Sequence, residues 1–254
     1  MSRNLILILF VFIFSGFACG SGPGAGDGLR LELPAITEKD DVVEHLGYVA
    51  SLNHDRLIPN WVAYELTREE LKGNEKRDTP FQWDPDVKGR QAWREDYSGS
   101  GWDKGHMVPR SDLKWSAKAY SESFYFSNIC PQNHEFNSGS WMTTENMAKR
   151  LANQYGFVYI VCGPLVFDNH FGTIGQHKVT VPDAFFKAFL ICDKGEYYAI
   201  GIVMRNWAER QDLKASAVTV DEVEDLCGFD LFSSLERTVQ EAAESKIVWS
   251  KWGI

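Results

Sequence analysis

The sequence has no apolar run long enough to span a bilayer. An apolar stretch extends over Leu5–Phe17, which is 13 residues, whereas a spanning helix needs about 20. This excludes an ordinary transmembrane helix there. Because Arg3 precedes the run and small residues follow it, the pattern predicts an export signal over residues 1–19. We therefore expect an exported protein, located in the periplasm, outside the cell or at the outer membrane.

Two kinds of export signal fit this segment. A plain secretory signal would be cut near Ala18 or Gly20. A lipoprotein signal would be cut before Cys19, whose lipid would then attach the protein to a membrane. Gly16 stands where the lipoprotein pattern usually has leucine. Both interpretations stay open.

The chain also lacks an excess of positive charge. It has 26 basic and 35 acidic residues and a formal net charge of -9. This argues against a protein that coats nucleic acid through many Lys/Arg–phosphate contacts. It does not exclude an enzyme that contacts a few phosphates and uses a metal ion to neutralise charge.

Closely spaced cysteines and a phosphate-binding loop are absent. No CxxC pair is present among Cys130, Cys162, Cys192 and Cys227, which argues against a structural zinc site. No GxxxxGK[ST] motif is present, so nucleotide binding through a P-loop is excluded. The spacing leaves the disulfide pairing open.

Hydrophobic residues make up 44% of the chain and aromatics 13%, as in globular proteins. Residues 20–40 begin with a Gly-rich segment and are interpreted as a tether, and residues 41–254 as one domain without internal repeats. Strands and helices alternate irregularly, which favours an α+β fold. The expected strands are Tyr48–Leu52, Trp61–Leu66, Ser123–Asn128, Phe157–Cys162, Phe185–Asp193 and Tyr197–Met204, and the expected helices are Ser140–Tyr155, Val220–Leu226 and Ser233–Ser245.

The first candidate for chemistry is the tetrapeptide Asp103-Lys104-Gly105-His106. Histidine has a pKa near neutrality and can take a proton from water, and the preceding glycine would let the backbone turn tightly and present the imidazole. A single histidine is more often a packed or surface residue, so this motif alone does not establish catalysis. His134 is expected on a loop surface, and His45, His54, His170 and His177 are interpreted as structural.

A second cluster follows an aromatic segment. Asn128 is followed nine residues later by Asn137 and eight residues after that by Glu145. Amide and carboxylate oxygens are ligands for Mg²⁺, Ca²⁺ or Mn²⁺. On an α-helix Glu145 would lie about 12 Å along the axis from Asn137, so a water-mediated role for Glu145 is expected. The alternative is that Asn137 caps the helix and Glu145 is a solvated surface residue.

Together these residues resemble the DNA/RNA non-specific endonuclease family, whose members have a ββα-metal fold. The family pattern is D-R-G-H, then S-N-x-x-P-Q, then Asn, Trp and Glu. The matching residues here are Asp103, Gly105, His106, Ser127, Asn128, Pro131, Gln132, Asn137, Trp141 and Glu145. The likeness covers roughly residues 45–240 and includes Trp61-Val62-Ala63-Tyr64 and Arg77 ahead of Trp83-Asp84-Pro85. It implies a single domain with a mixed, mainly antiparallel sheet flanked by helices.

The resemblance also implies roles for individual residues. His106 would be the general base, Asn137 the direct ligand of a hydrated Mg²⁺, and Glu145 would hold the waters of the ion, with Asp103 as a second outer-shell candidate. Mn²⁺ or Ca²⁺ are alternatives to Mg²⁺. Asn128 would help to position the metal–phosphate group, and Arg77 would stabilise the phosphate in the transition state. DNA and RNA would be cleaved to leave 5′-phosphate ends; the oligomeric state stays open.

One residue departs from the family pattern. Lys104 stands where the family has an arginine that faces the phosphate, so the planar bidentate fork is replaced by a point charge. Weaker positioning of the substrate with retained chemistry is expected. Two other functions stay open: a phosphodiesterase of narrower substrate range, and a non-catalytic surface lipoprotein that binds nucleic acid on a nuclease scaffold.

Overall fold

The computed structural model describes residues 30–76 and 78–254. Its strands are β1 (Asp41–Glu44), β2 (Val49–Asn53), β3 (Ile58–Thr67), β4 (Asp103–His106), β5 (Ile129–Gln132), β6 (Phe157–Leu165), β7 (Thr173–Ile174), β8 (Val179–Thr180), β9 (Ala184–Asp193), β10 (Glu196–Arg205) and β11 (Ala217–Val218). Its α-helices are α1 (Ala117–Glu122), α2 (Met142–Tyr155), α3 (Val220–Cys227) and α4 (Arg237–Glu244). The expected export signal over residues 1–19 lies outside the described residues, as does most of the Gly-rich segment.

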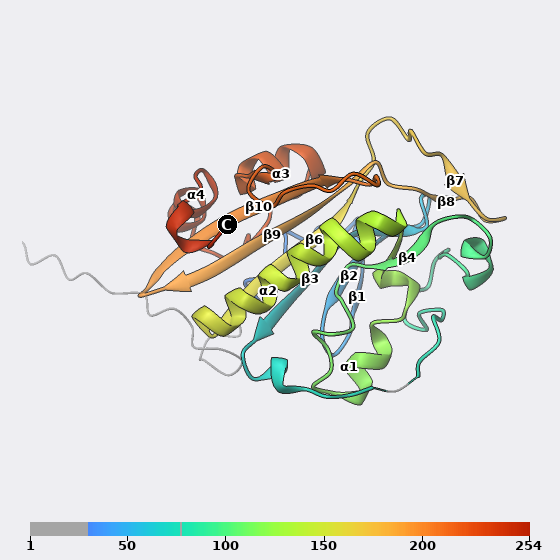
Figure 1. The fold of residues 1–254 in the computed structure, drawn as a ribbon, viewed down its shortest axis with the longest axis horizontal. Coiled ribbons are helices and arrows are strands. Elements are labelled where there is room, and N and C mark those ends of the chain that lie inside the picture. The colour runs from blue at the N-terminus through green and yellow to red at the C-terminus, as the bar shows by residue number, and fades with distance from the viewer. Residues whose placement is uncertain (1–29, 77) are drawn as a thin grey trace, which may run out of the picture.

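A seven-stranded sheet forms the centre of the molecule (Figure 1). Its strand order is β1-β2-β3-β6-β9-β10-β11, and the neighbouring strands are antiparallel. Two short antiparallel pairs, β4–β5 and β7–β8, stand apart from this sheet. The expected α+β fold with a mainly antiparallel sheet is confirmed.

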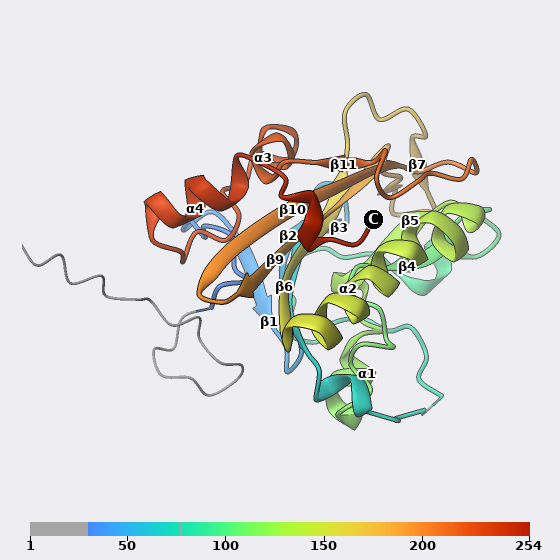
Figure 2. The same cartoon turned by 60° about the vertical axis from the view of Figure 1, so that its left-hand side comes forward.

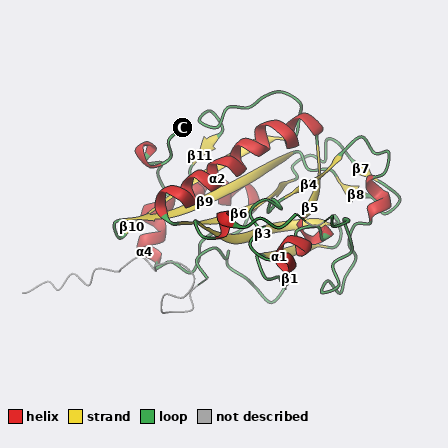
Figure 3. Cartoon of the chain, turned by 60° about the horizontal axis from the view of Figure 1, so that its bottom comes forward, coloured by secondary structure: helices red, strands yellow, loops and turns green. Residues whose placement is uncertain are grey.

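Helices cover both faces of the sheet. Figure 2 shows α2 on one side of the strands and α3 and α4 on the other, and Figure 3 shows α1 on the side of α2. Two buried clusters result, one with Leu151 of α2 and one with Val223 of α3. Strand β9 contributes to both, because successive side chains point to opposite faces: Phe185 and Phe189 join the first cluster, Phe186 and Leu190 the second.

The helix ends follow local capping rules. Thr219 caps α3, accepting from the backbone N–H of Glu222, whose side chain bonds back to Thr219. Helix α4 begins at Arg237 instead of Ser233, because the Glu236 carboxylate accepts from the N–H groups of Thr238 and Val239. Trp141, just before α2, and Thr144, Ala148 and Leu151 on α2 are buried as expected.

The expected strand Ser123–Asn128 is wrong. The segment forms turns and a 3-10 helix over Phe126–Asn128, and strand β5 begins only at Ile129. The amide of Asn128 donates to the carbonyl of Ser123 at 2.9 Å and closes the segment into a turn. Its aromatic side chains mimic a strand in composition, but the local side-chain-to-backbone bond decides the backbone path.

The segment before β1 is attached to the domain. Leu31 is buried in the cluster that contains Val223, and the N–H of Ala35 donates to the carbonyl of Asp230 at 2.8 Å. Residues 31–35 therefore contact the face of the sheet that α3 and α4 cover, although they fall within the range interpreted as a tether.

Candidate active site

The tetrapeptide with His106 forms β4, which pairs with β5 so that Gly105 faces Cys130 and His106 faces Ile129. The tight turn expected at Gly105 is wrong, since Gly105 lies within the strand and is not among the residues with positive φ. The glycine is required for another reason. A Cβ atom there would lie 2.1 Å from Oε1 of the buried Gln132 side chain. Gly105 thus allows close contact between β4 and β5.

The imidazole of His106 lies between two aromatic rings. Its centroid is 5.4 Å from that of Phe81 and 5.4 Å from that of Phe124. Its Nε2 atom is buried and has no hydrogen-bond partner among the described residues. Burial lowers the pKa of His106 to about 4, and the positive charge of Arg110 contributes. The imidazole is therefore neutral near pH 7 and able to accept a proton.

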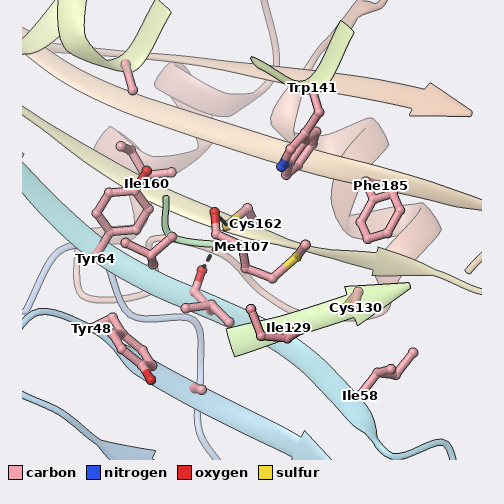
Figure 4. Close-up of a cluster of buried hydrophobic side chains, with 14 of the residues drawn as sticks. Tyr48, Ile58, Tyr64, Met107, Ile129, Cys130, Trp141, Ile160, Cys162 and Phe185 are labelled. Carbon is pink, nitrogen blue, oxygen red and sulfur yellow. Dashed lines mark hydrogen bonds between the residues drawn. The ribbon is translucent and has the colours of Figure 1, made fainter. Parts of the chain in front are cut away.

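Met107 anchors the chain just after the imidazole. Its side chain is fully buried, and Figure 4 shows it beside Cys162 and among Ile129 and Trp141. The thiol of Cys162 donates to the carbonyl of Met107 at 3.4 Å. The Trp141 indole N–H donates to the carbonyl of His106 at 3.1 Å. Strand β6 and the start of α2 thus fix the backbone that carries the histidine.

Asn128 acts on the same backbone. Its Oδ1 accepts from the N–H of Val108 at 2.9 Å, and its Nδ2 donates to the carbonyl of Val108 at 3.0 Å. The side chain is fully buried. It is therefore placed to hold the loop after His106, and burial separates it from any phosphate in solvent.

Asn137 and Asp103 lie together. Asn137 Nδ2 donates to Asp103 Oδ2 at 2.9 Å, and the same oxygen lies 2.9 Å from Nδ1 of the exposed His134. This bond orients the amide and leaves its Oδ1 without a partner among the described residues. Asn137 belongs to a π-helical turn, Phe136–Trp141, that precedes α2, so the α-helical spacing assumed between Asn137 and Glu145 does not apply.

Glu145 lies in the first turn of α2, where charged groups are buried nearby. Burial raises the pKa of Glu145, Asp112 adds to the rise, and Lys187 and Lys149 oppose it. Asp112 is fully buried, and its Oδ1 lies 3.6 Å from Nζ of Lys149. Two carboxylates and two ammonium groups, two of them on α2 and two on the segments packed against it, thus influence one another.

Lys187 was missed by the sequence analysis. It lies on β9, fully buried, with Nζ 4.4 Å from the ring centroid of Trp141 and 3.4 Å from the carbonyl of Met107. The signal was available: Lys187 is a single charge within the apolar run Phe185–Cys192. A buried lysine needs such partners to offset the loss of hydration.

Of the two cationic residues expected to contact phosphate, the structure describes Lys104 but not Arg77. Lys104 has its Nζ 5.5 Å from the ring centroids of both Phe81 and Tyr97, on the side of the histidine where Phe81 packs. Arg77 lies outside the described residues.

The donor set around Asn137 fits a hydrated divalent cation. The free amide oxygen of Asn137 is a hard neutral ligand, and the carboxylates of Asp103 and Glu145 are acceptors for metal-bound water. The described groups of three His, Cys, Asp or Glu side chains that converge within ion-binding distance lie elsewhere: His45, Asp84 and Asp86, and Asp221, Glu224 and Glu244. A site whose ligands are an amide oxygen and waters is not among these groups, because an amide is not one of the four side-chain types that define them.

Strands β4 and β5 are followed by helix α2, with a neutral histidine on β4 and an amide at the start of the helical segment. This arrangement defines a ββα-metal hydrolase class of fold. The family model described as DNA/RNA non-specific endonuclease matches residues 33–238. The chain belongs to this family.

Known proteins similar to this chain include mitochondrial and bacterial nucleases. The mitochondrial nuclease EXOG of Xenopus laevis is 31% identical over 233 residues, covering 80% of this chain and 65% of that protein. A nuclease of Nostoc sp. is 31% identical, covering 79% of this chain and 76% of that protein. A solved structure described as the EndoG/EndoGI complex has a TM-score of 0.75 and 28% identity, and the match covers 83% of this chain and 92% of that one.

The comparisons correct the expected location. The chain spans 65% and 57% of the lengths of the Xenopus laevis and human EXOG proteins, and both are mitochondrial nucleases. The nuclease 1 of Schizosaccharomyces pombe, 33% identical, is mitochondrial as well. These relatives contradict the expectation of an exported protein and give no support to membrane attachment through Cys19. Between residues 30 and 254, Arg77 excepted, no helix has the length and hydropathy to cross a membrane.

Replacing Asn128 with alanine is expected to destabilise the fold. The change removes the bonds to Val108 and Ser123 and leaves their buried backbone groups without partners, so we expect a loss of about 3 kcal/mol in the free energy of unfolding. Urea denaturation followed by tryptophan fluorescence measures it. The exposed Asn74→Ala is the matched control and should lie within about 0.5 kcal/mol of wild type. A loss below about 1 kcal/mol in Asn128→Ala would contradict the clamp role.

Proposed function

We propose that this chain is a metal-dependent endonuclease that hydrolyses the phosphodiester bonds of DNA and RNA and leaves 5′-phosphate ends. The observation that carries the proposal is the Nε2 atom of His106, which is buried, uncharged near neutrality and without a partner among the described residues. A base that must take a proton from water needs such a free nitrogen. Membership of the nuclease family supports the substrate class.

The proposed roles follow from the contacts. His106 takes a proton from the attacking water. Asn137, oriented by Asp103, would hold Mg²⁺ through Oδ1, while Glu145 and Asp103 would bind its waters. When bound, the cation neutralises the charge that develops on the leaving oxygen. Mn²⁺ and Ca²⁺ are alternatives with the same donor preference.

The other polar groups position the machinery and the substrate. Asn128 and Lys187 hold the backbone of residues 107 and 108, behind the base. Lys104 and Arg77 would contact the phosphate. Since phosphates carry no sequence information, contacts confined to them give a broad substrate range.

The central test is cleavage of plasmid DNA and of RNA with and without Mg²⁺. Wild type is expected to cleave both, and His106→Ala to lower kcat by at least about a thousandfold, because the water loses its base. Asn137→Ala should have a comparable effect that excess Mg²⁺ relieves only in part. Circular dichroism checks that both variants fold.

Three outcomes separate the proposal from other functions. Binding of nucleic acid without cleavage under any of the three cations would favour a binding module. Cleavage of small phosphodiesters but not of polymers would favour a narrower phosphodiesterase. Cleavage that survives His106→Ala would refute the proposed base.

The pH dependence tests the environment of His106. Protonated imidazole cannot act as a base, so kcat/KM should stay high as the pH falls from 7 and drop as it approaches about 4. The positive charge of Arg110 helps to lower this pKa, so Arg110→Gln should move the acid limb to higher pH. The measurement is the ratio of kcat/KM at pH 5 and pH 7. The exposed Arg94→Gln is the control, and an acid limb unmoved or lowered in Arg110→Gln contradicts the assignment.

Because Lys104 replaces the arginine of the family pattern, we expect restoring the arginine to raise activity. In Lys104→Arg the guanidinium can bind a phosphate through two parallel hydrogen bonds, so we expect kcat/KM to rise by roughly 5- to 30-fold, equivalent to about 1–2 kcal/mol. The measurement is initial rates on a short duplex of defined length. The interpretation of Lys104 as a phosphate contact is wrong if the rate is unchanged or falls.

A further inference from the structure

Two exposed tryptophans lie side by side outside the group of catalytic residues. The ring centroids of Trp83 and Trp93 are 5.3 Å apart, and the rings are inclined by 32°. Trp83 is 53% exposed and Trp93 is 45% exposed. The imidazole of His177 continues the row, because it stacks on Trp93 with centroids 5.7 Å apart. Single exposed apolar side chains are ordinary, but a contiguous group of them typically marks a binding surface.

The three rings line a pocket of about 450 Å³. Two cationic residues, Lys88 and Arg90, also line it. Both side chains are exposed, and neither has a salt bridge among the described residues. Aromatic faces beside unpaired cations suit a single-stranded nucleic acid, whose bases stack on the rings while its phosphates contact the cations.

The carboxylates nearest to this pocket in the sequence are turned into the protein. Asp84 and Asp96 are almost fully buried. Both carboxylate oxygens of Asp96 lie 3.0 Å from Nδ1 of His177. These two acidic groups therefore have partners within the protein, whereas the charges of Lys88 and Arg90 stay available to a phosphate.

The loop that carries the pocket is held in shape by buried side chains. Oε1 of Gln91 accepts from the N–H of Asp84 at 2.9 Å, and its Nε2 donates to the carbonyl of Asp84 at 2.9 Å. The N–H of Trp93 donates to Oδ2 of Asp96 at 2.9 Å, at the start of a 3-10 helix over Arg94–Tyr97. Because the rings are already positioned, a ligand would bind them at a small cost in conformational entropy.

The pocket adjoins the candidate active site along the chain. Phe81, which packs against the imidazole of His106, is two residues before Trp83, so the Cα atoms of Phe81 and Trp83 are at most about 7 Å apart. Tyr97, whose ring centroid lies 5.5 Å from Nζ of Lys104, ends the 3-10 helix that follows the second tryptophan. A polymer bound at the histidine would therefore pass close to the tryptophans.

We propose that Trp83, Trp93 and His177 form a base-stacking platform for a single-stranded stretch of the nucleic acid substrate, with Lys88 and Arg90 on its phosphates. The substrate class rests on the proposed nuclease function. Every base has a flat face, so stacking adds affinity without a preference for sequence. In a duplex the bases are stacked on one another, so the platform favours single strands over duplexes.

The test is binding in the absence of cleavage. The full chain with His106→Ala is kept in a chelator and titrated into a fluorescein-labelled single strand of about 12 nucleotides, with anisotropy as the readout. In that background Trp83→Ala should raise Kd about tenfold, because a stacking surface is lost, and Trp83→Phe should raise it less, because a ring remains. Trp249→Ala removes a tryptophan that is 44% exposed and lies outside the pocket, so this control should stay within about twofold of the background.

The salt dependence of binding tests the two cations. In the same background, the double substitution Lys88→Gln and Arg90→Gln should make the plot of log affinity against log salt concentration shallower by about 1.4, since each lost phosphate contact to a single strand accounts for about 0.7. The matched control replaces two exposed lysines outside the pocket, Lys194→Gln and Lys246→Gln, and should keep the slope of the background.

The platform is refuted if Trp83→Ala and Trp93→Ala both bind the single strand as Trp249→Ala does, or if they weaken binding to a duplex of the same length equally. A dimer that these substitutions dissociate, with the affinity for the single strand unchanged, would also refute it and assign the tryptophans to a contact between copies. Since these measurements need no cleavage, loss of the platform leaves the proposed nuclease function standing. Conversely, a wild type that fails to cleave leaves this binding test valid.

Discussion

The two hydrogen bonds between the Asn128 side chain and the Val108 backbone are the constraint on which the position of the chain after His106 depends. They connect the residue just before β5 to the chain just after β4, although the two are 20 positions apart in sequence. Without this clamp Val108 would lose its side-chain partner, whereas His106 and Met107 would keep the bonds from Trp141, Cys162 and Lys187. A general base gains its effect from position, so a buried amide with no contact to substrate can matter as much as a ligand.

Around this clamp the protein combines an apolar wall with buried charge. Phe81 and Phe124 pack against the imidazole of His106, and burial keeps it neutral, whereas Glu145 and Lys149 of α2 lie near the buried Asp112 and Lys187. The two regions act in opposite ways. The first lowers the affinity of a nitrogen for protons, and the second keeps carboxylates close to charged partners that offset their burial.

The sequence predicted the long elements well, because these depend on local patterns. Strands β3, β6, β9 and β10 have continuous apolar runs, and the Thr219–Glu222 capping box marks the start of α3. Features that depend on tertiary contact were not predictable. The role of Gly105 depends on Gln132, which approaches from another strand, and the 3-10 helix before β5 depends on the bond from Asn128 to Ser123.

The net charge likewise does not show how the charges are distributed around the proposed site. The chain carries a formal charge of -9, yet Lys104, Arg110, Lys149 and Lys187 all lie next to or behind the proposed catalytic groups. A phosphate that approaches His106 responds to these near charges, because more distant ones are screened over about 8 Å at physiological salt. For the proposed nucleic-acid substrate, the acidic excess would affect long-range attraction, while local cations would determine binding at the site. An acidic chain and a phosphate-binding site are compatible for this reason.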